Sequence, residues 1–173
     1  MYFEKLITQT VETYSEVGMI HTDHTFLFEE AVWQVQGKYF DAENNEFEMD
    51  GMAKISHKQM HWLNEGYMRV HTKEPHDFFN FYEITPFGKE TDFTNWESYN
   101  PSMGLLKGKY MIIDDTIISS FKSEYSSYSG VEYLKKTDSA TYQNRGFSFR
   151  GEKKLASWSL TLKKIVDNIR FLV

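Results

Sequence analysis

The feature that most constrains this fold is a two-residue alternation of side-chain character that begins near residue 31. Odd positions are apolar or small and even positions are polar: Trp33, Val35, Gly37 and Tyr39 alternate with Gln34, Gln36 and Lys38. Successive side chains of a strand point to opposite faces, so residues 31–41 are predicted to form a strand with one buried face. The pattern resumes at Phe47 after the turn residues 43–45, which predicts a β-hairpin.

Later segments repeat this alternation between turn residues, and we interpret Gly66 as a break between strands at 60–64 and 67–72. The whole pattern predicts a meander of about eight to ten strands. The connections are too short for parallel crossovers, which favours antiparallel neighbours. An open sheet of this size would leave two long edges, so we expect an up-and-down β-barrel rather than an immunoglobulin-like sandwich.

The residues before the barrel have a different period. Apolar side chains spaced by three and four predict an amphipathic α-helix over 1–18, with 19–24 as a linker. We therefore expect a single domain over 1–173, with the barrel over 25–165. Glu4, Glu12 and Glu16 interrupt the apolar run that a signal peptide needs, and no apolar stretch reaches membrane-spanning length. These observations predict a cytoplasmic protein with no membrane partner.

Composition narrows the classes of partner. The chain has 14 Phe, 11 Tyr and 4 Trp, residues that suit a pleated surface, and it has no cysteine, which excludes disulfides and thiolate chemistry. A net charge of −6 opposes nucleic-acid binding. The lysines at 153, 154, 163 and 164 are interpreted as a solvated strand edge. We expect no nucleic-acid partner, and a homodimer is possible.

The order of these features resembles that of the calycin group, which includes lipocalins and fatty-acid-binding proteins. The shared features are a leading helix, a first strand that carries Trp33 within 31–37, a tight hairpin and a meander ending near the C-terminus. This resemblance implies an internal cavity for a small ligand. In fatty-acid-binding proteins an Arg and a Tyr near the last strands hold a carboxylate, and Tyr142, Arg145 and Arg150 lie in the matching region.

Two arginines are candidates for such an anion site. Arg69 shares a strand face with Tyr67 and His71; if that face points inward, the guanidinium could hold a carboxylate. If the other face is buried, Arg69 is solvated. Arg145 shares a face with aromatic residues. It is interpreted either as a buried residue that binds an anion or as a side chain that extends into solvent at the rim of the barrel. The predicted ligand-binding residues are Tyr67, Arg69, His71, Phe81, Tyr110, Phe121, Arg145 and Phe147. Trp33 and Trp158 are expected to be structural.

Three functions remain open. The first is binding of a small hydrophobic or amphipathic ligand, with or without a carboxylate, inside the barrel. The second is a cofactor-free lyase or isomerase that uses the cavity, with catalytic residues we cannot assign. The third is a protein-interaction module with an aromatic-filled barrel. The six histidines lack the spacing of metal ligands, and no nucleophile elbow or phosphate loop occurs, so we expect neither metal nor cofactor.

Overall fold

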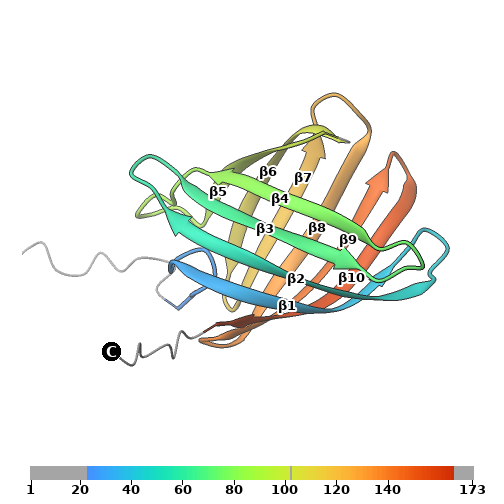
Figure 1. Ribbon diagram of the computed structural model, residues 1–173. Helices are drawn as coiled ribbons and strands as arrows, with labels where there is room; N and C mark the ends of the chain where they lie inside the picture. Colours follow the sequence, from blue (N-terminus) through green and yellow to red (C-terminus); the bar gives the residue numbers. More distant parts are fainter. Residues whose placement is uncertain (1–22, 102, 166–173) are drawn as a thin grey trace, which may run out of the picture.

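The computed structural model describes residues 23–101 and 103–165, which contain ten β-strands and no helix (Figure 1). The strands are β1 (Ala31–Phe40), β2 (Glu46–His57), β3 (Trp62–Val70), β4 (His76–Ile84), β5 (Phe93–Asn100), β6 (Gly104–Ile113), β7 (Thr116–Ser123), β8 (Tyr128–Asp138), β9 (Thr141–Arg150) and β10 (Lys153–Lys164). Each pairs antiparallel with its sequence neighbours, and β1 pairs with β10 to close a barrel. The predicted antiparallel barrel is confirmed, whereas the predicted helix over 1–18 lies outside the described residues.

Among the described residues, no segment forms a helix with the length and hydropathy needed to cross a bilayer.

The first hairpin follows the predicted alternation. Trp33 and Val35 of β1 are completely buried, and Trp33 faces Ala53 of β2 in the pairing register. The connecting turn is built around Asp41, whose carboxylate accepts the backbone N–H groups of residues 43 and 45 at 3.0 and 2.8 Å. Asn44 adopts a left-handed φ of 67°, which Asn tolerates better than most residues. The hairpin therefore fixes which faces of β1 and β2 point into the barrel.

The predicted break at Gly66 is wrong, because β3 runs without interruption through this residue. A Cβ added to Gly66 would lie only 2.0 Å from the backbone oxygen of Met52 on β2. The glycine therefore permits close backbone approach inside a strand rather than marking a turn. As a result, Met68 lies on the inner face of β3, and Tyr67 and Arg69 lie on the outer face.

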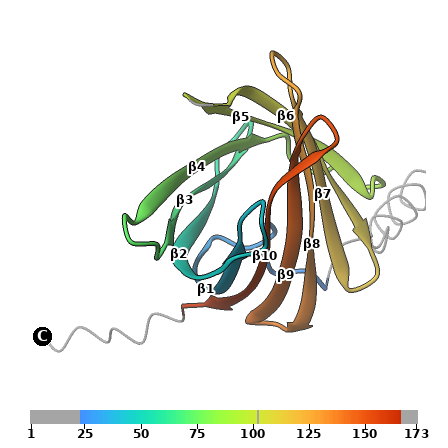
Figure 2. The same cartoon turned by 90° about the vertical axis from the view of Figure 1, so that its right-hand side faces the viewer.

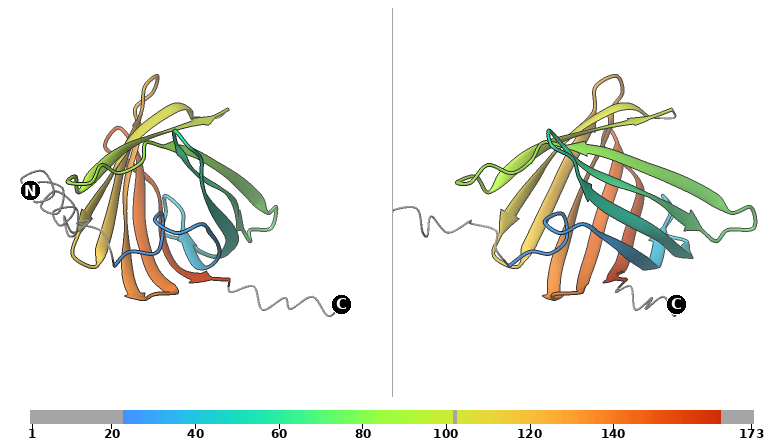
Figure 3. Two further views of the ribbon diagram at one scale, coloured as in Figure 1. Left: turned by 90° about the vertical axis from the view of Figure 1, so that its left-hand side faces the viewer. Right: turned by 60° about the vertical axis from the view of Figure 1, so that its left-hand side comes forward.

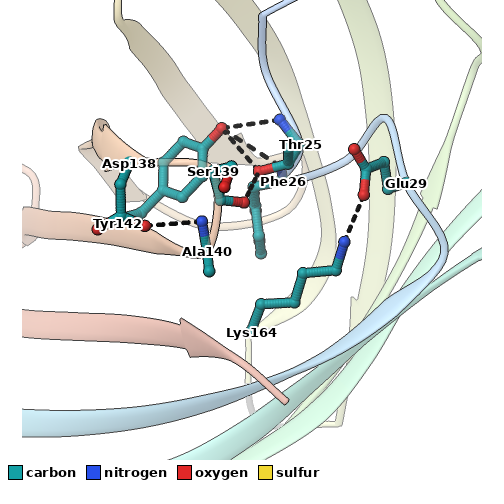
Figure 4. Close-up of polar contacts among 8 residues, drawn as sticks. All are labelled: Thr25, Phe26, Glu29, Asp138, Ser139, Ala140, Tyr142 and Lys164. Carbon is teal, nitrogen blue, oxygen red and sulfur yellow. Dashed lines mark hydrogen bonds and ion pairs between the residues drawn. The ribbon is translucent and has the colours of Figure 1, made fainter. Parts of the chain in front are cut away.

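One end of the barrel is closed by residues 24–28, which precede β1 (Figure 3). Phe26 and Leu27 in this plug are buried, with exposed fractions of 3% and 0%. The Tyr142 hydroxyl accepts the backbone N–H groups of Thr25 and Phe26 at 3.0 and 3.3 Å (Figure 4). The edge-to-face contact of Phe26 with Trp33, at 5.3 Å between ring centroids, completes the packing.

Strands β4 and β5 separate toward the opposite end of the barrel (Figure 2). Only two register pairs join them, at Glu83–Glu97 and Ile84–Trp96 near the plugged end. Every other neighbouring pair of strands is joined by at least seven register pairs. Residues 76–82 of β4 therefore form an edge, and the barrel is widest open at the end away from the plug.

Candidate functional site

The barrel encloses a cavity of about 220 Å³ to which all ten strands contribute side chains or backbone. Phe26 of the plug forms part of its wall at the closed end. At the other end the wall includes Phe79 and Asn80 of the β4 edge, and Asn100 across the gap on β5. An apolar cavity of about 150 Å³ is large enough for benzene, and pockets for drug-sized ligands span about 300–1,000 Å³. The cavity is therefore the right size for a ligand that contains a single ring.

Glycines let large aromatic side chains lie flat against this wall. A Cβ added to Gly146 of β9 would lie 2.3 Å from the Trp158 ring, and one added to Gly108 of β6 would lie 2.3 Å from the Trp96 ring. Each indole thus occupies the space over a glycine on the neighbouring strand. Because the rings lie along the wall instead of pointing across the barrel, the interior stays hollow despite its aromatic content.

A row of three facing residues on β10, β9 and β8 places a carboxylate on the wall. Trp158 faces Gly146, which in turn faces Glu132. The buried Asn144 side chain donates its amide to Glu132 Oε2 at 3.0 Å and to the Tyr133 carbonyl at 3.0 Å, which fixes the amide orientation. Glu132 retains some accessible surface because it faces the cavity, although protein surrounds it on its other sides.

Burial raises the pKa of the Glu132 carboxyl, while hydrogen bonding from Asn144 and the Trp158 indole partly offsets the rise. The described residues that line the cavity include no lysine, arginine or histidine, so Glu132 is their single charged group. A carboxylate has about four acceptor positions, and the neighbouring amide and indole do not occupy them all. The remaining acceptor capacity is available to a molecule in the cavity.

Three tyrosines, from β4, β6 and β8, line the cavity together with this carboxylate. Burial, together with the negative charge of Glu132, raises the pKa of Tyr82, Tyr110 and Tyr128, so their hydroxyls stay protonated at neutral pH. Trp96 contacts Tyr82 edge to face at 4.7 Å between ring centroids. These rings and Phe121 form a continuous set of contacts that we call the aromatic wall: Tyr82, Trp96, Tyr110, Phe121 and Tyr128.

Of the predicted ligand-binding residues, the structure places Tyr110 and Phe121 on the cavity wall. Tyr67, Phe81 and Phe147 lie on the outer face, with exposed fractions of 36%, 43% and 48%. Trp158, which we expected to be structural, also lines the cavity.

The predicted polar residues have partners on the outside of the barrel. Arg69 forms a two-pronged ion pair with Asp77 at 2.7 and 2.8 Å, which lowers the pKa of Asp77. His71 pairs with Asp50 on the neighbouring strand. Arg145 donates to the Leu160 carbonyl at 3.0 Å, across the outer face of β9 and β10. None of these three side chains reaches the cavity wall.

Glu132 is not among the residues predicted from the sequence to bind a ligand. The observed strand β8 begins at Tyr128, and its even positions Tyr128, Glu132 and Leu134 all line the cavity. The signal available was this longer alternation together with Gly130. In the described parts of the chain, 23–101 and 103–165, no group of three or more His, Asp or Glu side chains is arranged to hold a metal ion.

Comparison with known proteins adds little to this geometry. No protein-family model and no curated protein matches the chain. An N-terminal dehydratase from the difficidin assembly line is 10% identical, with 82% of this chain and 80% of that chain covered and a TM-score of 0.26. The Nitrosomonas europaea protein that carries the provisional name AttH is 10% identical, with 86% and 54% covered and a TM-score of 0.30. Similarity this low carries no argument about function.

Proposed function

We propose that this protein binds a small, largely apolar molecule inside its barrel, in keeping with the resemblance to calycins. The observation that carries the proposal is the cavity of about 220 Å³, open at one end and plugged at the other. Its wall is formed mainly by apolar and aromatic side chains, with a few polar groups that could orient a ligand. The favourable free energy of binding would come from transferring apolar ligand surface out of water.

The test is a titration with the neutral single-ring probe 2-phenylethanol. Because Trp96 and Trp158 line the cavity, we expect a saturable change in tryptophan fluorescence with one molecule bound per chain. Asn80→Trp would place a large ring at the cavity mouth and should weaken binding about tenfold or more, as expected when about 1.4 kcal/mol is lost. Phe81→Trp, the neighbouring position on the outer face, is the matched control and should leave the affinity unchanged. Equal affinity in both variants would reject internal binding.

A cofactor-free enzyme is a second candidate, and Glu132 is the observation that favours it. A carboxylate with a raised pKa, beside protonated tyrosines in a cavity, is the arrangement used for general-base catalysis. The hydroxyls of Tyr110 and Tyr128 could stabilise an oxyanion that develops as Glu132 removes a proton.

The probe for this second function is 5-nitrobenzisoxazole, from which a base removes the ring C–H proton as the N–O bond breaks to give a cyanophenolate. We expect a rate that increases with pH through the pKa of Glu132 and is lost in Glu132→Gln. Equal rates in both proteins would reject this second function.

A further inference from the structure

We propose that the cavity selects small organic cations, specifically primary amines on a single aromatic ring, with the ammonium group bound by Glu132 and the ring held by the aromatic wall. This inference rests on the proposed internal binding and names its ligand class. It reverses the charge expected from the sequence, where Arg69 and Arg145 were the candidates to hold a carboxylate. The geometry that carries it is the placement of a carboxylate on the cavity wall with no basic side chain among the described lining residues.

The charge balance around Glu132 favours a cationic ligand. Its two neighbours on the wall, Asn144 and Trp158, are neutral donors that stabilise the carboxylate without cancelling its charge. The basic side chains Arg69 and Arg145 are engaged on the outer face, with Asp77 and with backbone carbonyls. An ionised group away from bulk water is costly unless it is paired, and a cation in the cavity would supply that pairing. A ligand carboxylate would instead be repelled.

The aromatic rings that line the cavity also favour a cationic ligand. The faces of Trp and Tyr rings attract cations, and such contacts strengthen when water is excluded. Tyr82, Tyr110 and Tyr128 come from three different strands, and all three line the same cavity as Glu132. An ammonium group bound to Glu132 would therefore also lie within the field of the aromatic wall.

The size of the cavity favours a ligand with a single ring. The cavity exceeds the roughly 150 Å³ that holds benzene and falls short of the roughly 300 Å³ where drug-sized pockets begin. One ring with a short aminoalkyl chain fits this range. Lipid-sized ligands with long acyl chains do not.

The test compares three probes of nearly equal shape: phenethylammonium, neutral 2-phenylethanol and the anion phenylacetate. Binding to the full-length protein is measured near neutral pH by calorimetry and tryptophan fluorescence. We expect phenethylammonium to bind about tenfold or more tightly than 2-phenylethanol, because a charge-assisted hydrogen bond is stronger than a neutral one. Phenylacetate should bind more weakly than either.

The key variant is Glu132→Gln, which keeps the shape of the side chain and removes its charge. It should bind phenethylammonium and 2-phenylethanol with affinities within about threefold of each other, so that the preference is lost, and a cooperative urea unfolding transition shows that it is folded. Glu83→Gln, on the outer face of β4, removes one negative charge outside the cavity and should keep the preference.

Each failure has a distinct meaning. If 2-phenylethanol binds inside the barrel and phenethylammonium binds no more tightly, the cation proposal is overturned and the proposed function stands. A preference for phenethylammonium that persists in Glu132→Gln also overturns it, since the charge would then act from elsewhere. If no probe binds, internal binding of single-ring molecules is rejected, and the cation proposal is rejected with it.

Discussion

At the scale of single residues, the site depends on Gly146 having no side chain. A Cβ there would lie 2.3 Å from the Trp158 ring and 2.8 Å from the Glu132 Cβ. Gly146→Ala should therefore displace the indole into the cavity, lower the free energy of unfolding by about 1–3 kcal/mol and weaken 2-phenylethanol binding. Urea unfolding and the fluorescence titration measure the two effects.

Gly88→Ala is the matched control for this substitution, because a Cβ at Gly88 would meet only the Thr91 side chain, at 3.1 Å or more. Its effect on stability should be small, and it should leave binding unchanged. A Gly146→Ala protein as stable as the control, with normal binding, would show that the indole does not need this space.

Residue identities alone could not decide whether Arg69 or Arg145 faces inward or outward. In 67–71 both faces carry apolar or aromatic side chains, so the alternation does not distinguish them, and a one-residue shift exchanges every inward and outward position. The pairing of Arg69 with Asp77 depends on the register between β3 and β4. Glu132 could not be identified from the sequence either, because the hydrogen bonding that acts on its carboxylate comes from Asn144 and Trp158 on other strands.

At the scale of elements, the plug is the segment whose attachment we expect to matter most. Tyr142 is completely buried, and its hydroxyl accepts the N–H groups of Thr25 and Phe26. Tyr142→Phe removes this acceptor and leaves buried donors without a partner, so it should lower the free energy of unfolding by about 1–3 kcal/mol. Urea unfolding measures the loss.

The control is Tyr133→Phe, whose ring lies on the outer face of β8 and is 40% exposed. It should change stability by less than about 0.5 kcal/mol, as surface substitutions usually do. If the two variants were equally stable, the Tyr142 hydroxyl would not be what holds the plug.

The strands themselves were largely predictable, for a physical reason. The first hairpin combines a regular alternation with a turn of Asn and Asp residues, so local chemistry and tertiary packing favour the same structure. The predicted break at Gly66 was wrong because a glycine in a turn and a glycine inside a strand look the same in the sequence. They differ only in how closely the backbone of a neighbouring strand approaches. The plug at 24–28 was not predicted, because its burial depends on Tyr142, more than a hundred residues away.

At the scale of the whole molecule, the buried carboxylate should make stability depend on pH. The folded-state pKa of Glu132 is raised above its ordinary value of 4.5, so the folded protein holds this proton to higher pH than the unfolded chain does. Its stabilising contribution is therefore complete below the ordinary pKa and is lost as pH rises through the folded-state pKa. The pKa values of Tyr82, Tyr110 and Tyr128, which line the same cavity, are raised above the ordinary value of 10, so these hydroxyls keep their protons throughout this range.

Wild-type protein should accordingly lose stability relative to Glu132→Gln as the pH rises above the ordinary pKa of 4.5 and through the raised folded-state pKa. Urea unfolding of both proteins across this range gives the difference directly. A difference that stays constant with pH would mean that burial does not perturb the Glu132 carboxyl.

The barrel is hollow, and we propose that its inner carboxylate is available to a ligand. A crystal structure with 4-bromophenethylammonium tests this most directly, because anomalous scattering locates the bromine independently of the protein density. We predict a bromine peak inside the barrel against the aromatic wall, with the ammonium nitrogen at hydrogen-bonding distance from Glu132. Bromine found only on the outer surface, or an interior filled by side chains, would show that the barrel does not bind this ligand through Glu132.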